Sequence, residues 1–215
     1  LDGVRVVEFS HMVMGPTCGL ILADLGADVV KVEPAPGGDK TRRLPGSGSG
    51  YFGTYNRNKR SISVNLKSVE GLEFATHLAR EFDVLPENFG AGVLGRLGLG
   101  YEVMQGSNPG LVYCELKGFL SGLYEQRAAL DEVVQMMGGL AYMTGLPDKP
   151  MRAGSSVIDI TGGMFGVISI LAALERRHCT GEGEIVSSSL FESTAFMVGQ
   201  HMAQQAVTGE EPKPM

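Results

Sequence analysis

The sequence has few cysteines, and they lie far apart. Cys18, Cys114 and Cys179 form no CxxC pair, and their number is odd. Such a set is typical of reduced thiols in a cytosolic protein, and it argues against a disulfide framework or a cysteine zinc site. The four histidines are equally dispersed, without HxxxH or HxxE spacing, so we expect no metal site.

An excess of positive charge is also missing. The chain has 18 Lys and Arg against 24 Asp and Glu, a net charge of -6. Surfaces that bind nucleic acid are normally basic, so we expect no nucleic-acid partner. No apolar run approaches the length of a membrane span, and no charged segment followed by an apolar one marks the N-terminus. We therefore expect no membrane association and a cytoplasmic location.

The residues that are present suit one large folded domain. Hydrophobic residues make up 43% and charged residues 20% of the 215 positions, which is enough to bury one good core. Strand-like runs alternate with helical patterns from residue 4 to 117, and this order is typical of α/β proteins. We predict a Rossmann-like parallel sheet flanked by helices in residues 1–200, with 201–215 beginning a linker. The expected strands are 4–9, 28–33, 61–66, 83–85, 111–116 and 184–191; the later helices are 130–141, from 163 onward, and 192–206.

In parallel sheets, ligands bind beyond the carboxyl ends of the strands. His11, Pro34, Asn88 and Lys117 should lie at those ends. Glu33 ends the second strand, where dinucleotide-binding folds place an acid that holds a ribose. The turn at 10–16 lacks G-x-G-x-x-G, however, so a dinucleotide-binding oxidoreductase is disfavoured.

One carboxylate stands out in the small-residue, apolar stretch 155–164. Asp159 comes just before a helical stripe, where free backbone N–H groups and the helix dipole favour an anion. It can therefore be a helix N-cap, the commoner role, or a nucleophile held in its ionised form. Gly162 and Gly163 are candidates for close approach to a ligand. Asp131, at the start of the 130–141 helix, is expected to be structural.

Two basic clusters contrast with the acidic chain. Lys40, Arg42 and Arg43 lie in a loop, and residues 57–60 follow. They are either solvated loop charge or contacts to a phosphate-rich ligand.

Eight stretches carry a family resemblance through their order and spacing from residue 1 to about 192. They are LDGVRVVEFSHMVMGP, LADLGADVVKVEP, GGDKTR, NRNKRSISVNLKSVEG, ENFGAGVLGRLGLGYE, NPGLVYCELKGF, IDITGG and ILAALERRHCTGEG. The chain resembles the N-terminal large domain of the class III CoA-transferases, the formyl-CoA transferase type, which also includes the alpha-methylacyl-CoA racemase branch.

The resemblance implies a CoA-transferase with coenzyme A as part of its substrate and no metal. Asp159 matches the nucleophile, which forms an aspartyl mixed anhydride and then an enzyme–CoA thioester. The partners would be acyl-CoA, a carboxylic acid and a second copy of the chain in an interlocked homodimer, with a small domain absent here. The positions that match CoA contacts are His11, Met12, Val13, Val64, Asn88, Phe89, Arg96 and Leu97.

Three positions depart from the family pattern. Val13 stands where formyl-CoA transferase has a glutamine that holds acyl intermediates, and Pro34 stands where a CoA-contacting arginine is found, so formyl and oxalyl substrates are disfavoured. Leu130 replaces the racemase histidine, which favours a transferase. Racemisation, an intramolecular CoA shift and a non-catalytic CoA-binding scaffold remain as alternatives.

Overall fold

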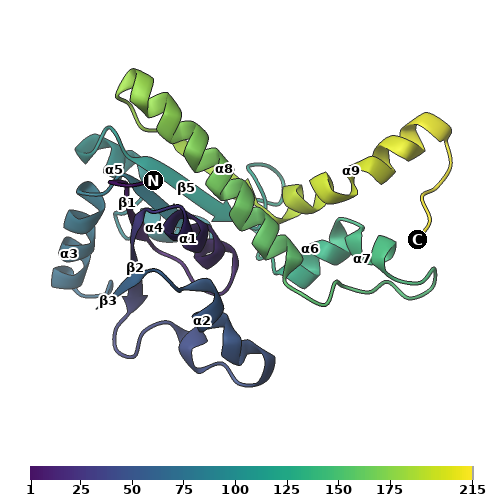
Figure 1. Cartoon of the computed structure of the whole chain (residues 1–215), viewed down its shortest axis with the longest axis horizontal. Coiled ribbons are helices and arrows are strands. Elements are labelled where there is room, and N and C mark those ends of the chain that lie inside the picture. The colour runs from purple at the N-terminus through teal and green to yellow at the C-terminus, as the bar shows by residue number, and fades with distance from the viewer. Residues whose placement is uncertain (215) are drawn as a thin grey trace.

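The fold is built on a six-stranded sheet in the order β3-β2-β1-β4-β5-β6, with every pair of neighbours parallel. In Figure 1 the strands lie in the left half of the view. In the computed structural model, residues 1–214 are described. This strand order is that of the Rossmann fold, so the predicted fold class is confirmed. The strands are β1 (Arg5–Glu8), β2 (Asp28–Pro34), β3 (Arg60–Val64), β4 (Val84–Glu87), β5 (Val112–Lys117) and β6 (Ile185–Ser189).

Helices cover both faces of the sheet because its strands are apolar on both sides. Val6 and Val84 point into one core with α1 and α8, while Val7 and Leu85 point into a second core with α3, α4 and α5. The α-helices are α1 (Met14–Asp24), α2 (Tyr51–Tyr55), α3 (Val69–Arg80), α4 (Val93–Arg96), α5 (Tyr101–Ser107), α6 (Asp131–Met137), α7 (Leu140–Thr144), α8 (Val157–Thr180) and α9 (Leu190–Thr208), with 3-10 turns η1 (Lys40–Arg43) and η2 (Gly46–Gly50).

Several predicted boundaries are wrong: α8 begins at Val157 instead of 163, and β4 continues to Glu87 instead of ending at 85. The 130–141 helix is broken into α6 and α7 at Gly139, whose φ of 84° a helix interior does not allow. The last strand ends at Ser189, because this serine caps α9 by accepting a hydrogen bond from the Glu192 amide at 3.3 Å. Helix α9 then continues to Thr208, so the first part of the expected linker is helical.

Helices α1 and α8 pack so closely that only glycine fits at two positions of α8, Gly162 and Gly163. A Cβ on Gly163 would lie 2.7 Å from the Met14 carbonyl oxygen, and one on Gly162 would lie 2.7 Å from Met14 Cε. These two glycines therefore admit a neighbouring helix, rather than the ligand that the sequence suggested.

Helix α8 also corrects the expectation about apolar runs. Its 24 residues have a mean hydropathy of 2.0 over an 18-residue window, so it is long and apolar enough to cross a membrane. Gly166, Ile170 and Leu174 on this helix are buried in the core that it shares with α1 and the sheet. Packing within the fold thus accounts for part of its apolar composition, since 44% of that window is buried.

Candidate active site

The switch point of the sheet lies between β1 and β4, where the strand order reverses and the following loops diverge. Asn88, just after β4, connects the two loops. Its Oδ1 accepts a hydrogen bond from the His11 amide and its Nδ2 donates to the His11 carbonyl oxygen, both at 2.9 Å. The Phe89 ring stacks on the His11 ring with centroids 5.8 Å apart. Three predicted CoA contacts are thereby brought together, at the carboxyl ends of strands as expected.

The loop after β1 is tightly constrained. Met12 has a φ of 63°, a backbone conformation that side-chain-bearing residues rarely adopt. Gly15 lets the start of α1 approach this loop, since a Cβ there would lie 2.5 Å from Ser10 Cβ and 2.8 Å from Asn88 Cγ. Close packing thus holds Met12 in a strained backbone conformation and, with the Asn88 hydrogen bonds, keeps His11 in place.

A buried ionic network lies beneath the same loop. Lys31 Nζ donates to the Ser10 carbonyl oxygen at 2.7 Å and pairs with Glu8 at 3.1 Å and with Asp39 at 3.3 Å. Lys59 Nζ pairs with the other Glu8 oxygen at 2.7 Å. Burial alone would raise the pKa of Glu8, but Lys59 and Lys31 outweigh it and lower that pKa. The network anchors Ser10, which leads into His11.

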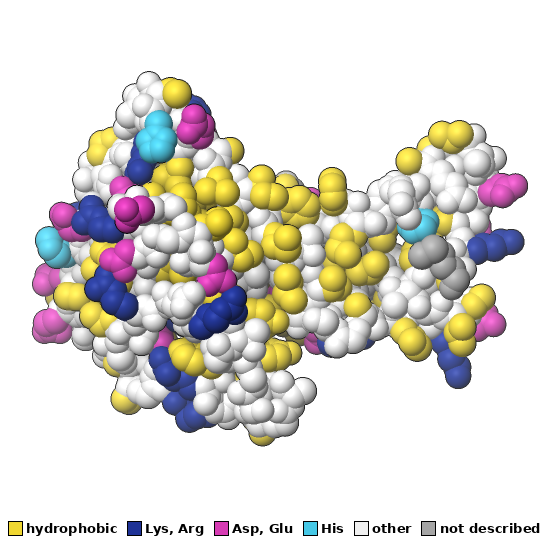
Figure 2. All heavy atoms as spheres, in the orientation of Figure 1, with side chains coloured by type: hydrophobic (Ala, Val, Ile, Leu, Met, Phe, Trp, Pro, Cys, Tyr) yellow, Lys and Arg dark blue, Asp and Glu magenta, His cyan; other side chains and the backbone are white. Residues whose placement is uncertain are grey.

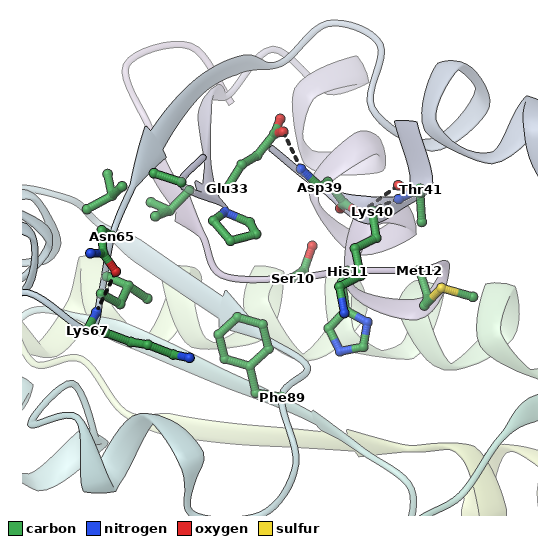
Figure 3. A pocket seen from close by; sticks show the side chains of 15 residues that line it. Ser10, His11, Met12, Glu33, Asp39, Lys40, Thr41, Asn65, Lys67 and Phe89 are labelled. Carbon is green, nitrogen blue, oxygen red and sulfur yellow. Dashed lines mark hydrogen bonds between the residues drawn. The ribbon is translucent and has the colours of Figure 1, made fainter. Parts of the chain in front are cut away.

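Two cavities open at this edge of the sheet. The first, of about 520 Å³, is lined by Val64 and Phe89 and carries the cations Lys40 and Lys67 (Figure 3). The second, of about 350 Å³, contains Asp159. His11 and Met12 line both cavities, so they form the wall between them; Val13, Asn88, Leu130 and Asp131 line the second.

Two of the eight predicted CoA contacts lie elsewhere. Arg96 ends α4, and its Nη1 lies 3.5 Å from the Ala91 carbonyl oxygen. Leu97 packs against the core beneath α3 and lines a separate surface hollow. Neither residue lines the two cavities at the switch point.

Asp159 is the third residue of α8, so the N-cap interpretation is wrong. The N-cap position is Ser156, whose side chain makes no capping hydrogen bond. Asp131 supplies the cap from another helix: its Oδ2 accepts from the amides of Ile158 at 2.8 Å and Asp159 at 3.0 Å. Within residues 1–214, the Asp159 carboxyl group has no hydrogen bond or ion pair of its own.

The environment of Asp159 favours its protonated form. Burial, followed by the negative charges of Asp131 and Glu132, raises its pKa from the ordinary 3.8 to about 7. Burial and the nearby Tyr51, Asp159 and Asp131 likewise raise the pKa of Tyr55. The helix-mouth amides expected to keep Asp159 ionised are used by Asp131 instead. Asp159 therefore exchanges its proton near neutral pH.

Most of the basic clusters are paired internally. Arg42 makes two hydrogen bonds of 2.7 Å to Glu33, which also removes the acid that a ribose would need. Arg57 pairs with Asp24 at 2.6 Å, and Arg60 pairs with Asp28.

Two lysines remain available at the first cavity. Lys40 and Lys67 have no ion-pair partner among residues 1–214 and line that cavity. Sequence reasoning missed Lys67, although its place three residues after β3 ends at Val64 is a signal that could have found it. In the same part of the chain, no group of three His, Cys, Asp or Glu residues could hold a metal ion.

The fold and site together define a Rossmann-type domain with a half-buried carboxyl group, unpaired among residues 1–214, in a cavity at its switch point. The family model described as CoA-transferase family III matches residues 1–215, and the chain belongs to this family.

Among its relatives, a formyl-CoA:oxalate CoA-transferase from Rhodopseudomonas palustris (strain TIE-1) is 43% identical over 88% of this chain and 46% of its own length. A succinate–glutarate CoA-transferase from Agrobacterium fabrum is 38% identical over 99% of this chain and 56% of its own. A crystal structure of a CAIB/BAIF family protein from Brucella suis superimposes with a TM-score of 0.93 at 39% identity, over the whole chain and 59% of that protein. The chain thus spans about half the length of its curated relatives.

Proposed function

We propose that this chain is part of an enzyme that moves CoA from an acyl-CoA thioester to a carboxylic acid, with Asp159 as the nucleophile. One observation carries the proposal. The unpaired Asp159 carboxyl group lies in a cavity that shares the His11–Met12 wall with a larger, lysine-bearing cavity. A long substrate with phosphates at one end and a thioester at the other fits such a pair of cavities.

The two cavities would divide the substrate between them. Lys40 and Lys67 supply charge for the phosphates of CoA, and Val64 and Phe89 supply apolar surface beside them. The thioester end would then reach past His11 to Asp159. The family match and the relatives' names support CoA as the ligand.

The chemistry needs only carboxylates and a thiol. An Asp159 oxygen attacks the thioester carbonyl, the C–S bond breaks, and an aspartyl mixed anhydride and CoA thiolate form. The thiolate attacks the aspartyl carbonyl, which releases the donor acid and leaves an enzyme–CoA thioester. The acceptor carboxylate attacks that thioester, giving a new anhydride and CoA thiolate; the thiolate then takes the acyl group and restores Asp159. Asp159 is the nucleophile only in the first step, where it must be unprotonated, and a pKa of about 7 allows this at neutral pH.

Two side chains in the second cavity restrict which acyl groups and which type of reaction the site favours. Val13 is buried and cannot hydrogen-bond an acyl oxygen, which disfavours formyl and oxalyl groups, so we propose another small or medium organic acid. Leu130 lines the cavity near Asp159 and cannot transfer a proton, which favours transfer over racemisation.

We also propose that the full-length protein is an interlocked homodimer. Figure 2 shows apolar side chains gathered over the middle of the molecule, where α8 and α9 meet. Ile168 is 59% exposed and Phe196 73% exposed on these helices, an apolar surface that a second copy would cover. Light scattering of the full-length protein tests the dimer.

We also propose a cytoplasmic location, which the three unpaired cysteines support.

Peptide mass spectrometry tests the activity. The full-length protein is incubated with a panel of acyl-CoA donors and trapped with hydroxylamine or borohydride. We expect modification at Asp159 in the wild type, none in Asp159→Asn, and normal modification in Asp148→Asn, which changes an exposed aspartate. Exchange of the α-proton in deuterated water without modification would support a racemase instead, and CoA binding with neither reaction would support a scaffold.

A further inference from the structure

Asp131 makes the capping hydrogen bonds at the start of α8 that the sequence assigned to Asp159. It begins α6 and is 4% exposed, and both of its carboxylate oxygens accept hydrogen bonds. One carboxylate oxygen accepts from the amides of Ile158 and Asp159, and the other accepts from Gln135 Nε2. An ionised carboxylate only accepts hydrogen bonds, so three donors suit its charged form.

Gln135 extends this arrangement to the segment before α8. It is fully buried, and its Oε1 accepts from the Ala153 amide at 2.7 Å. Asp131 and Gln135 therefore hold both the approach to α8 and its first turn. Because the Asp159 amide is one of the bonded groups, the nucleophile's backbone is held directly.

The same geometry places two carboxyl groups at one helix start. Asp131 takes the amides that would otherwise stabilise an Asp159 anion, and both residues line the second cavity. The other titratable or charged groups at this cavity or within reach of Asp159 are His11, Tyr51 and Tyr55, Lys117 paired with Glu87, and Glu132 with Arg152 3.9 Å away.

We propose that Asp131 is a positioning residue: it holds the backbone of Asp159 at the start of α8, and its negative charge opposes ionisation of the Asp159 carboxyl group. The proposal rests on the proposed role of Asp159 as nucleophile. A carboxylate that binds its proton more tightly is also more basic, and hence more reactive toward a thioester carbonyl once ionised. The charge of Asp131 would thus lower the ionised fraction of Asp159 and make the ionised Asp159 a stronger nucleophile.

The test follows the rate of Asp159 modification by a saturating acyl-CoA donor between pH 5 and 9, in the full-length wild type and in Asp131→Asn. Asparagine keeps one oxygen for the α8 amides and removes the charge. We expect the acid limb of the profile to move down by about one pH unit. At pH 5.5, the rate relative to each protein's own plateau would rise roughly fivefold to tenfold, while the plateau falls.

Two further variants serve as controls for this experiment. Glu132→Gln removes an equal charge from the adjacent residue without touching the α8 amides, and it should move the limb less. Asp131→Ser provides a second neutral variant should Asp131→Asn fail to fold. A limb at the wild-type pH in a folded neutral variant, with rates reduced equally at every pH, would overturn the proposal and leave Asp131 as a structural cap. Absence of any modification in the wild type would instead overturn the proposed function itself.

Discussion

Asn88 and His11 are 77 residues apart in the chain, yet two reciprocal 2.9 Å hydrogen bonds join the side chain of Asn88 to the backbone of His11. These bonds connect the loops after β1 and β4 at the switch point, where the strand order of the sheet reverses. His11 forms part of the wall between the two cavities. The coupling therefore holds in place a residue that both halves of a bound CoA thioester would contact.

Substitution of Asn88 should affect binding and stability together. Asn88→Ala leaves the His11 amide and carbonyl without their partner, so we expect a loss of about 1–3 kcal/mol in the free energy of unfolding and about tenfold weaker CoA binding. Asn88→Asp keeps an acceptor for the His11 amide and should show a smaller loss of stability. Urea denaturation and calorimetric titration with CoA measure both quantities. Unchanged CoA affinity in Asn88→Ala would argue against a substrate at this wall.

The two free lysines of the first cavity should act through phosphate. We expect Lys40→Ala and Lys67→Ala each to weaken CoA binding about tenfold, with a smaller effect at high salt. Binding of pantetheine, which lacks the nucleotide phosphates, should not change. Arg57→Ala is the matched control, because Arg57 is paired with Asp24 away from the cavity. Equal weakening for CoA and pantetheine would place the phosphates elsewhere.

Removing the Asp159 charge should stabilise the fold in a pH-dependent way. Its pKa is about 7 in the folded protein against an ordinary 3.8, so ionisation costs folding free energy as pH rises between those values. Asp159→Asn avoids this cost. Because solvent reaches the half-buried group, we expect a gain of about 1–3 kcal/mol above pH 7, vanishing near pH 4. Thermal unfolding across this range measures the difference; equal stability at every pH would contradict the raised pKa.

Much of the fold was accessible from the sequence, because burial on both sides gives parallel strands nearly continuous apolar runs. Their order along the chain also located the strand ends, and with them His11, Asn88 and Lys117. The predicted ends of helices and strands were wrong at positions such as Gly139 and Ser189, where one residue determines the end. Gly139 splits a helix that its apolar neighbours would continue, and Ser189 ends a strand by capping the next helix.

The site was less accessible, because its decisive contacts join distant segments. Asp159 has the local pattern of an N-cap, but the cap comes from Asp131, 28 residues earlier, through the packing of α6 against α8. Local spacing could not distinguish the two aspartates. Likewise, the sequence pattern around Lys59 predicts a solvent-exposed loop residue, yet its side chain is buried and pairs with Glu8. Partner choice depends on tertiary packing, which a one-dimensional pattern does not contain.

The close contact of α1 and α8 predicts an asymmetry between two glycines. Gly163→Ala would place a Cβ 2.7 Å from the Met14 carbonyl oxygen and 2.9 Å from Thr17 Cβ, which forces the helices apart. We expect a loss of about 1–3 kcal/mol and reduced Asp159 modification, because α8 carries the nucleophile. Gly199→Ala in α9 meets no atom within 4 Å and should be neutral or stabilising by up to about 1 kcal/mol. Chemical denaturation of both variants measures the contrast, and similar losses in both would refute it.

The buried network beneath His11 should make the protein sensitive to acid. The pKa of Glu8 is lowered, so its contribution to stability is present above its ordinary pKa of 4.5 and is lost as pH falls through the lower folded value. Lys31→Met removes the ion-pair partner of Asp39 and one of the two ion-pair partners of Glu8, and breaking such a buried arrangement costs about 3–5 kcal/mol. With less positive charge nearby, the Glu8 pKa rises and the acid-unfolding midpoint should move to higher pH. Arg60→Met, which breaks the exposed pair with Asp28, should cost less than about 1 kcal/mol and leave that midpoint in place. Circular dichroism during acid titration follows the midpoint; a Lys31→Met protein that unfolds at the wild-type pH would mean that Lys59 alone keeps Glu8 ionised.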